Sequence, residues 1–260
     1  KKGSVERYLK MVENQVLTLS SDVSIQDAMV EFKESFYNVI EENKYSKADI
    51  IGFRSELAKF YKNDFGKKYE KDNGAPIRTA KLVKNLSDTE VVHQYHYIVA
   101  NSSELGAKDG LDYADDKSSY TRSHKKFHPS IRHFLSSFKY YDIFLVDHKT
   151  GNVVYSVYKE LDYGTSLLTG PYKSTNFANA FKEAADLDSP DSFSAADYET
   201  YLPSYDAPAS FIASPIFKNG IKVGVLVFQM PIDELNAIMT ARAGLGETGE
   251  TFIVGSDFKM

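Results

Sequence analysis

Histidine is the side chain in this sequence with the most direct capacity for chemistry, and three of the six histidines lie within the ten residues "HKKFHPSIRH". On a continuous helix His124 and His128 share one face, a spacing that zinc hydrolases use together with a glutamate general base inside the motif. No glutamate lies between these two histidines, and Pro129 disturbs the helical register. A metal-dependent hydrolase using His124, His128 and His133 is therefore one alternative, and histidines that simply pack or face solvent are the other.

A second group of chemically capable residues surrounds the segment "VVYSVYKELDYGTSLLTGPYKS", which is rich in tyrosine. Ligand sites commonly combine aromatic walls with a few polar groups that fix orientation. Lys159 can meet an anionic group, and Asp162 or Asp206 a cationic one. The alternative is that these tyrosines are ordinary core at a sheet edge. The candidate ligand-binding residues are Tyr155, Tyr158, Lys159, Asp162, Tyr163, Tyr172, Ser174, Ser210 and Phe228.

Other catalytic patterns are missing from the sequence. There is no G-x-S-x-G, and the chain contains no cysteine for a thiolate nucleophile, a metal site or a disulfide. The glycine-rich "GLGETG" precedes a predicted strand, whereas a phosphate-binding loop follows a strand and opens a helix. We therefore predict that this fragment is not an enzyme and that it needs no cofactor.

Composition places the chain among soluble globular proteins, with 42% hydrophobic and 26% charged residues. The 31 basic residues are interspersed with 36 acidic ones for a net charge of −5, which argues against nucleic acid as a partner. No apolar run approaches the roughly 18 residues that span a bilayer. The N-terminus lacks both Met and an apolar leader, so we expect a piece of a longer protein.

The elements that must position these residues begin with a long helix over residues 1–45, spanning roughly 60 Å at 1.5 Å per residue. Its apolar positions follow a heptad seam that restarts out of phase at "LSSDVS", where we expect a kink or a rotated contact face. The first seam is Val5, Leu9, Val12, Val16, Leu19 and Val23, and the second is Ile25, Met29, Phe32, Phe36 and Val39.

Residues 46–139 are predicted to form a helical region that packs on the sheet module. Ser46 caps its first helix and Asp88 a later one, and "YTRSHKKFHPSIRHFLSSF" gives a last helix that is interrupted or begun at Pro129.

Residues 140–242 change character, because β-rich runs are joined by short turns. Two hairpins, "YYDIFLVD"/"NVVYSVYK" and "SFIASPIF"/"IKVGVLVFQM", flank a short helix capped near Ser174. Hairpins give an antiparallel sheet, whereas a doubly wound parallel sheet needs crossover helices. The predicted fold class is α+β: a long N-terminal helix and a helical region packed on a PAS-like antiparallel sheet. Residues 243–260 are predicted to form a linker and the first strand of a second, smaller PAS-like module.

The two hairpins, the "GPY" loop, the "ASPI" strand and the "GETGE" linker, in this order, resemble the double Cache (tandem PAS-like) sensor domains of bacterial transmembrane receptors. Such receptors include sensor histidine kinases and chemoreceptors. The resemblance implies a helix rising from the membrane, a membrane-distal module that binds ligand and a membrane-proximal module beyond it. The amino-acid-binding subset carries an Arg-x-Trp pair, and this chain has no Trp.

The predicted function is therefore an extracytoplasmic, periplasmic ligand-sensing domain of an inner-membrane receptor. Its predicted partners are an unknown small molecule and a second copy that pairs through the N-terminal helix. The predicted site has no metal. The alternatives are the metal-dependent hydrolase and a structural helical dimerisation protein.

Overall fold

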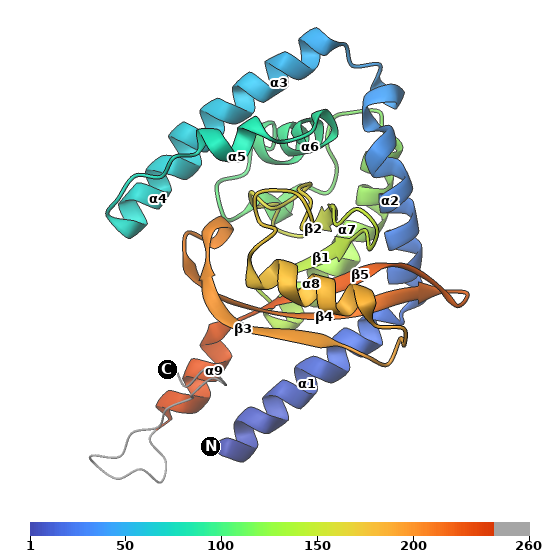
Figure 1. Ribbon diagram of the computed structural model, residues 1–260, viewed down its shortest axis with the longest axis vertical. Coiled ribbons are helices and arrows are strands. Elements are labelled where there is room, and N and C mark those ends of the chain that lie inside the picture. Colours follow the sequence, from blue (N-terminus) through green and yellow to red (C-terminus); the bar gives the residue numbers. More distant parts are fainter. Residues whose placement is uncertain (242–260) are drawn as a thin grey trace.

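The fold is built on a five-stranded antiparallel sheet in the order β2-β1-β5-β4-β3, described here by a computed structural model of residues 1–241 (Figure 1). The strands are β1 (Asp142–Val146), β2 (Val153–Ser156), β3 (Ser194–Tyr201), β4 (Ala207–Lys218) and β5 (Ile221–Met230). The predicted α+β class is confirmed, and this order is consistent with a PAS-like module. The strand expected at "ETFIV" lies outside the described residues.

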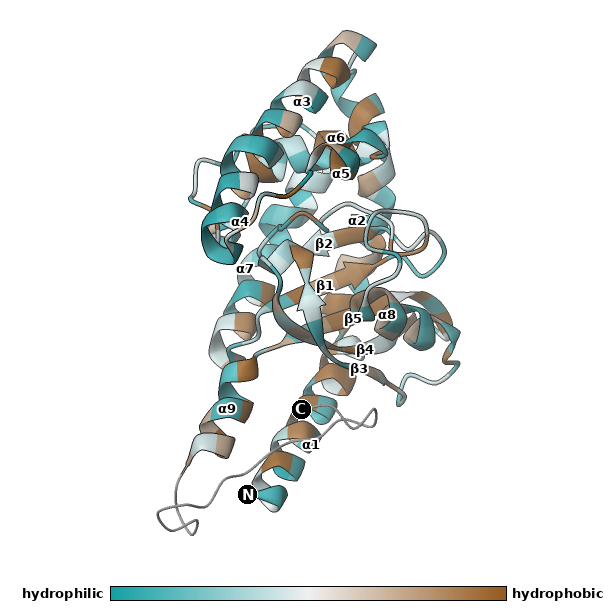
Figure 2. Cartoon of the chain, turned by 60° about the vertical axis from the view of Figure 1, so that its left-hand side comes forward, coloured by the Kyte–Doolittle hydropathy of each residue, from teal (hydrophilic) through white to brown (hydrophobic). Residues whose placement is uncertain are grey.

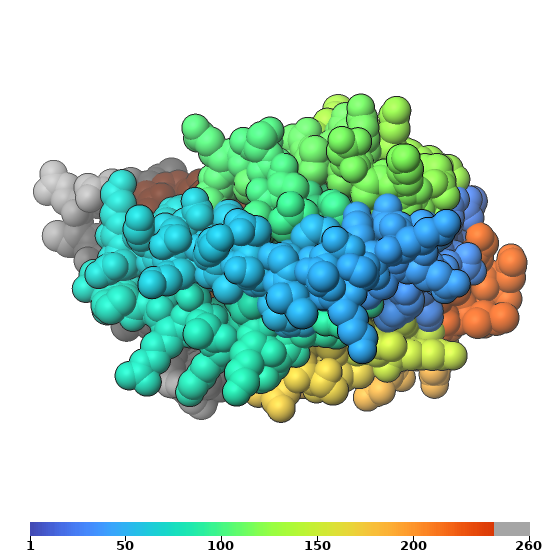
Figure 3. All heavy atoms as spheres, turned by 90° about the horizontal axis from the view of Figure 1, so that it is seen from above, coloured from blue at the N-terminus to red at the C-terminus, as the bar shows by residue number. Residues whose placement is uncertain are grey.

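Helices cover both faces of the sheet and one of its ends. The α-helices are α1 (Lys2–Ser20), α2 (Val23–Asn43), α3 (Lys47–Phe60), α4 (Gly66–Asn73), α5 (Ala80–Lys84), α6 (Asp88–Gln94), α7 (Ser119–Phe138), α8 (Asn176–Asp186) and α9 (Ile232–Thr240). Short π- and 3-10 segments are η1 (Tyr61–Phe65), η2 (Tyr95–Val99), η3 (Lys108–Gly110) and η4 (Leu202–Ser204). Seen from above, the helical region of residues 46–139 closes the upper end of the molecule (Figure 3).

The predicted long helix is two helices, because the chain breaks at the slip between the two seams. Asp22 leaves the helical region of backbone space, and its carboxylate accepts hydrogen bonds from the N–H groups of Ser24 (2.8 Å) and Ile25 (3.3 Å). The first N–H groups of α2 have no acceptor in α1. The Asp22 carboxylate supplies one, and this side-chain cap stabilises the start of α2. The second seam is buried throughout. The first contributes only Val12 and Val16 to the core.

Two of the other helices differ from the sequence prediction, and the predicted cap near Ser174 is confirmed, since the adjacent Thr175 caps α8. Ser87, not Asp88, caps α6 and forms a capping box with Glu90. Helix α7 runs through Pro129 without interruption. Proline removes one intrahelical donor there, while apolar residues on both sides of it are buried and keep the helix on the core.

The predicted hairpins are confirmed. Asn219 and Gly220 join β4 to β5 with φ of 53° and 76°, the paired positive angles of a two-residue hairpin turn. Asp147 holds the turn between β1 and β2 against α2, because its carboxylate pairs with the Lys33 ammonium at 3.0 Å and accepts from the Tyr37 hydroxyl at 3.0 Å. Strand β2 ends at Ser156, earlier than the predicted run to Lys159.

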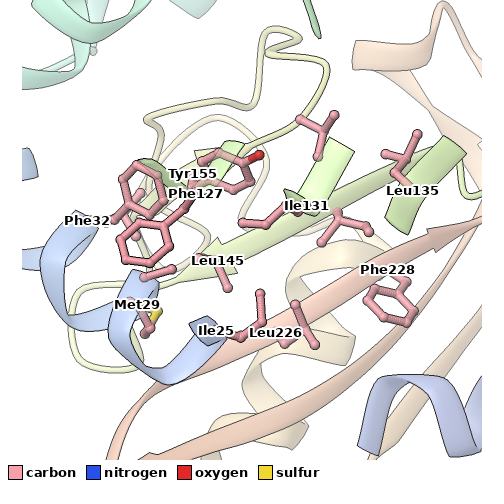
Figure 4. Close-up of a cluster of buried hydrophobic side chains, with 14 of the residues drawn as sticks. Ile25, Met29, Phe32, Phe127, Ile131, Leu135, Leu145, Tyr155, Leu226 and Phe228 are labelled. Carbon is pink, nitrogen blue, oxygen red and sulfur yellow. The ribbon is translucent and has the colours of Figure 1, made fainter. Parts of the chain in front are cut away.

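The sheet separates two hydrophobic cores. One core joins α1, α2 and α7 to alternate residues of the strands, with Phe32 and Tyr155 in contact at ring centroids 4.7 Å apart (Figure 4). The other joins α8, α3 and α6 to the opposite face, where Phe177 stacks on Phe211 at 4.7 Å. Strands β4 and β5 are largely apolar, whereas β3 and the outer helix α4 are largely hydrophilic (Figure 2). Residues from each of the predicted segments 1–45, 46–139 and 140–242 belong to these cores.

A pair of glycine substitutions tests how closely α2 packs on the sheet. A Cβ added to Gly224 of β5 would lie 2.2 Å from Met29 Sδ, so Gly224→Ala forces α2 and the sheet apart. We expect a loss of about 1–3 kcal/mol in the free energy of unfolding, partly restored by Met29→Ala. The control is Gly52→Ala on exposed α3, where nothing lies within 4 Å. That change should stabilise by about 0.5–1 kcal/mol. Denaturant unfolding measures both, and a neutral Gly224→Ala contradicts the packing.

Candidate functional site

The residues that follow β2 form the region of the molecule where buried charged side chains are concentrated. Asp142, a charged residue at the start of a buried strand, accepts hydrogen bonds from the Ser156 hydroxyl (2.7 Å) and the Val157 N–H (2.9 Å). The Ser156 oxygen in turn accepts from the Lys159 N–H at 2.8 Å. These bonds end β2 and turn the backbone, with Lys159 in the left-handed region at φ 55°. The segment 158–161 is thereby directed toward the helical region.

A small cavity lies between this segment, η4 and the helical region. Its volume is about 20 Å³, which is room for about one water molecule. Apolar and aromatic side chains from separate elements form its walls, among them Phe60, Phe65, Tyr158 and Tyr205. Its charged wall residues are Lys108, Lys159 and Glu160. The cavity thus combines apolar walls with charge, as ligand sites do.

Both lysines are buried, with exposed fractions of 6% for Lys108 and 1% for Lys159. Lys108 Nζ donates to the carbonyl oxygen of Asn101 at 2.6 Å, and Lys159 Nζ donates to that of Val157 at 2.8 Å. Within the described residues, no carboxylate oxygen lies within 4.0 Å of either ammonium group. Burial lowers the pKa of Lys108, and it lowers that of Lys159 to about 7 against the opposing effect of Asp142.

Carboxyl groups gather next to the cavity. Asp142, Glu160 and Asp162 lie close enough to influence one another, and burial raises the pKa of all three, that of Asp142 to about 7 and that of Asp162 to about 6. Each has a donor from the chain: the Ser204 hydroxyl donates to Glu160 (3.1 Å) and the Tyr201 hydroxyl to Asp162 (2.6 Å). These carboxyls are therefore held in place by neutral donors.

Three buried polar atoms of this region have no hydrogen-bond partner within the described part of the chain. They are Asp162 Oδ1, the Tyr172 hydroxyl and Gln229 Oε1. Gln229 lies opposite Asp142 in the β1–β5 register, and the rings of Tyr172 and Tyr201 are 6.3 Å apart. Such atoms are costly to leave unpaired. The end of the sheet nearest the cavity is thus polar and incompletely satisfied.

A wider groove lies along the loop of residues 100–115. Its volume is about 700 Å³, and Tyr95, His96, Asp112 and Tyr113 are among its walls. Tyr113 and Asp115 are exposed there, and Asp112 pairs with Arg132 at 3.0 Å. Because its charges face solvent, we regard the buried cavity as the stronger candidate site.

His124 and His128 lie inside the core with α2 and α7, close enough to Lys159 for its charge to lower the pKa of both. His124 and His128 stack with ring centroids 4.3 Å apart. His128 Nε2 donates to the Asp109 carbonyl oxygen and Nδ1 accepts from the Tyr155 hydroxyl, both at 2.7 Å. His133 is exposed and does not join them. Among residues 1–241 no three His, Asp or Glu side chains are grouped to hold a metal ion. The three histidines of the hydrolase alternative are therefore not brought together.

The structure distributes the nine predicted site residues over several environments. Tyr158 and Lys159 line the cavity, and Asp162 and Tyr172 are buried beside it. Tyr155, Tyr163 and Phe228 belong to the core that is formed with α1, α2 and α7. Ser174 is exposed, and the Ser210 hydroxyl donates to the Ala196 carbonyl oxygen at 2.8 Å. Only the first four are positioned to share one site, and their role in binding stays a prediction.

The sequence reasoning missed Lys108, Glu160, Asp142 and Gln229. Asp142 carried a usable signal, since a charged residue in the apolar run "YYDIFLV" requires buried partners. Glu160 lies between two predicted residues. Lys108 gave no signal, because the polar loop that contains it reaches the cavity only through the tertiary fold.

Comparison with known proteins gives limited likenesses. No protein-family model matches the chain, and no curated protein matches it. Among solved structures, the V. cholerae histidine kinase DctB sensor domain is 15% identical over 56% of this chain and 51% of that one, with a TM-score of 0.35. The ligand-binding domain of the Campylobacter jejuni chemoreceptor Tlp3, solved with 4-methylisoleucine, is 11% identical over 81% of this chain and 64% of that one, with a TM-score of 0.31.

Both of these structures are sensory domains of bacterial receptors, the class that the sequence resemblance predicts. The chain spans about half of the first and 64% of the second. At these TM-scores neither likeness carries an argument about the site. Within residues 1–241, no helix is long and apolar enough to cross a membrane.

The buried histidines predict acid sensitivity. Burial, aided by the Lys159 charge, lowers the pKa of His128 from 6.5 to about 2, so the unfolded chain binds this proton first as the pH falls. The stability that neutral His128 provides is complete above pH 6.5 and is lost below it. The advantage of the wild type over His128→Gln in free energy of unfolding should therefore shrink by up to about 2.7 kcal/mol between pH 6.5 and 4.5. The matched control, His133→Gln on the surface, should show no such change. Parallel pH profiles for wild type and His128→Gln would contradict the prediction.

Proposed function

We propose that this chain is the extracytoplasmic ligand-sensing domain of a bacterial transmembrane receptor, a histidine kinase or chemoreceptor. The observation that carries the proposal is the cavity at the end of β2, where the buried side chains of Lys108 and Lys159 meet apolar walls. Binding sites concentrate such groups, whereas a core that only supports the fold leaves few of them. The site is therefore proposed to take a small molecule.

The arrangement of the first and last described helices supports a role in signalling. Helices α1 and α9 lie side by side below the sheet (Figure 1), and the Lys1 ammonium donates to the Met239 carbonyl oxygen. The end of α1 is tied to the sheet by the contact between the Ser20 and Ser214 hydroxyls at 3.0 Å. A change in the packing of the sheet module can therefore reach both helices at the same end of the molecule. In the proposal, this end faces the membrane and the module is periplasmic.

Binding of a small molecule is tested by thermal unfolding in the presence of organic acids, amines, amino acids, sugars and purines. A ligand at 100 times its dissociation constant should stabilise the domain by about 2.7 kcal/mol. Since the chain has no cysteine, Arg7→Cys on α1 and Ala237→Cys on α9 can carry spin labels without interference. We expect the ligand to shift the distance between the labels.

The two parts of this test fail separately. A ligand that binds without changing the label distance contradicts relay through α1 and α9. A blank across all five classes contradicts small-molecule sensing and favours the structural dimerisation alternative.

The proposal includes a homodimer that pairs through α1. Leu9, a residue of the first seam, is 43% exposed on this helix, and a second copy would bury it. Leu9→Lys should shift the sedimentation of the domain from dimer to monomer. The control is Val23→Lys at the start of α2, which is 68% exposed and lies outside the proposed contact. A wild-type domain that is monomeric at high concentration would contradict this part.

A further inference from the structure

We propose that the stacked rings of Phe65 and Tyr205 form a gate to the cavity, and that helix α4 is the latch that holds this gate closed. The proposal rests on the proposed function, because it gives the route by which a ligand enters the site, but its tests need no ligand. Its basis is one ring pair on the cavity wall and a set of contacts that tie α4 to a single turn of the sheet module.

The gate joins the two parts of the molecule between which the cavity lies. Phe65 is the last residue of η1 in the helical region, and Tyr205 follows η4 on the way from β3 to β4. Their rings stack with centroids 4.8 Å apart, and both residues line the cavity. Since about 20 Å³ has room for about one water molecule, a larger ligand needs a wall that opens. Separating this pair would open the cavity between the helical region and the sheet.

Helix α4 holds the turn after η4 through three of its side chains. The Tyr69 hydroxyl donates to the Asp206 carboxylate, and the Asn73 amide donates to the Tyr205 carbonyl oxygen at 3.1 Å. The Lys68 ammonium lies 4.2 Å from the centre of the Tyr205 ring. Within the described part of the chain, every side-chain hydrogen bond from α4 to a residue outside the helix ends on this turn. The latch is therefore specific to the residues of the gate.

Little else fixes α4 in place. The helix contributes no buried residue to either core, and it lies at the outer edge of the helical region (Figure 1). It follows the π-helical segment η1, a kind of irregularity that is frequent at functional sites. Residues 74–79 after it have no regular secondary structure. Segments with few buried apolar contacts open locally at low cost, so α4 can leave the turn as a unit.

The turn that α4 holds is strained. Tyr205 and Asp206 have φ of 58° and 61°, in the left-handed region that residues other than glycine seldom occupy. The turn keeps this conformation through its own backbone hydrogen bonds and through the contacts with α4. Loss of the α4 contacts removes part of this support. The strain then favours a change in φ that carries the Tyr205 ring away from Phe65.

Amide hydrogen exchange of the whole domain tests the latch. We expect the amides of α4 to exchange by local opening, faster than those of β5, the central strand. Tyr69→Phe removes one latch hydrogen bond and should accelerate exchange in α4 by roughly 3-fold or more, with no change in β5. The matched control is Tyr37→Phe, which removes the tyrosine hydrogen bond to the Asp147 carboxylate at 3.0 Å and should leave α4 unchanged. Exchange of α4 only through global unfolding overturns the proposal.

A single thiol on the cavity wall tests the gate. The chain has no cysteine, so Ile98→Cys places the sole thiol at a cavity residue that is 2% exposed. Tyr69→Phe should accelerate its reaction with dithiobis(nitrobenzoate) by roughly 3-fold or more. The control is Val154→Cys on β2, which is buried and is not a cavity residue. An unchanged rate at Ile98→Cys, or equal acceleration of both thiols, overturns the gate.

Two substitutions of Asp206 separate the contribution of strain from that of the latch contact. Asp206→Ala and Asp206→Gly both remove the carboxylate, but only glycine adopts positive φ without a steric cost. We expect the alanine variant to accelerate the reaction of Ile98→Cys by roughly 10-fold and the glycine variant by a smaller factor. Equal or reversed rates would contradict a contribution of strain. If the alanine variant does not fold, Tyr69→Phe and Asp206→Gly still decide whether the latch holds the gate.

The outcomes separate the gate from the proposed function. A domain that binds a small molecule in the thermal screen, with neither local exchange in α4 nor faster labelling of Ile98→Cys, has a site that is reached by another route, and the gate is wrong. A gate that opens as expected, in a domain that binds none of the five ligand classes, supports the gate and overturns small-molecule sensing.

Discussion

The buried carboxylate of Asp142 is the interaction on which the candidate site depends. A carboxylate in the core is tolerated only where hydrogen bonds replace its water, and here the donors come from the residues at which β2 ends. Satisfying Asp142 therefore fixes the place where the chain leaves the sheet. Ser156, which donates to Asp142, also accepts from the Lys159 N–H. Through Ser156, Asp142 thus fixes the position of the Lys159 backbone. The polar end of the sheet follows from this single aspartate in an otherwise apolar strand.

The parts of the fold that the sequence predicts well are those determined by local rules. The hairpin at Asn219 and Gly220 follows from two residues that tolerate positive φ between β-rich runs. The break after α1 follows from the phase slip between the two seams, and Asp22 marks it. A boundary that depends on two opposing effects was predicted wrongly. Pro129 was expected to interrupt or begin a helix, but the burial of the apolar face of α7 outweighs the loss of one hydrogen bond.

The site was harder to predict because side chains alternate along a strand. Tyr155 and Ser156 are neighbours in sequence, yet a β-strand directs them to opposite faces. Tyr155 therefore packs on Phe32 and His128, while Ser156 bonds to Asp142. A cluster chosen by proximity in sequence mixes the two sides of the sheet. Lys108 reaches the cavity from a distant loop, and no local pattern could pair it with Lys159.

The same alternation gives the molecule a physical basis for communication between its two cores. Strand β2 and the segment after it contact both sides: the Tyr120 hydroxyl of α7 donates to the Val154 carbonyl oxygen at 2.7 Å, and Ser156 and Lys159 belong to the polar end beside the cavity. Contact alone does not make a switch. A ligand shifts an equilibrium only by the difference in its affinity for two arrangements. In this fold the difference can arise at the cavity wall, since the cavity of about 20 Å³ has room for about one water molecule and a larger ligand needs a wider arrangement. The energy available for signalling is then the difference in the ligand's affinity for the two arrangements.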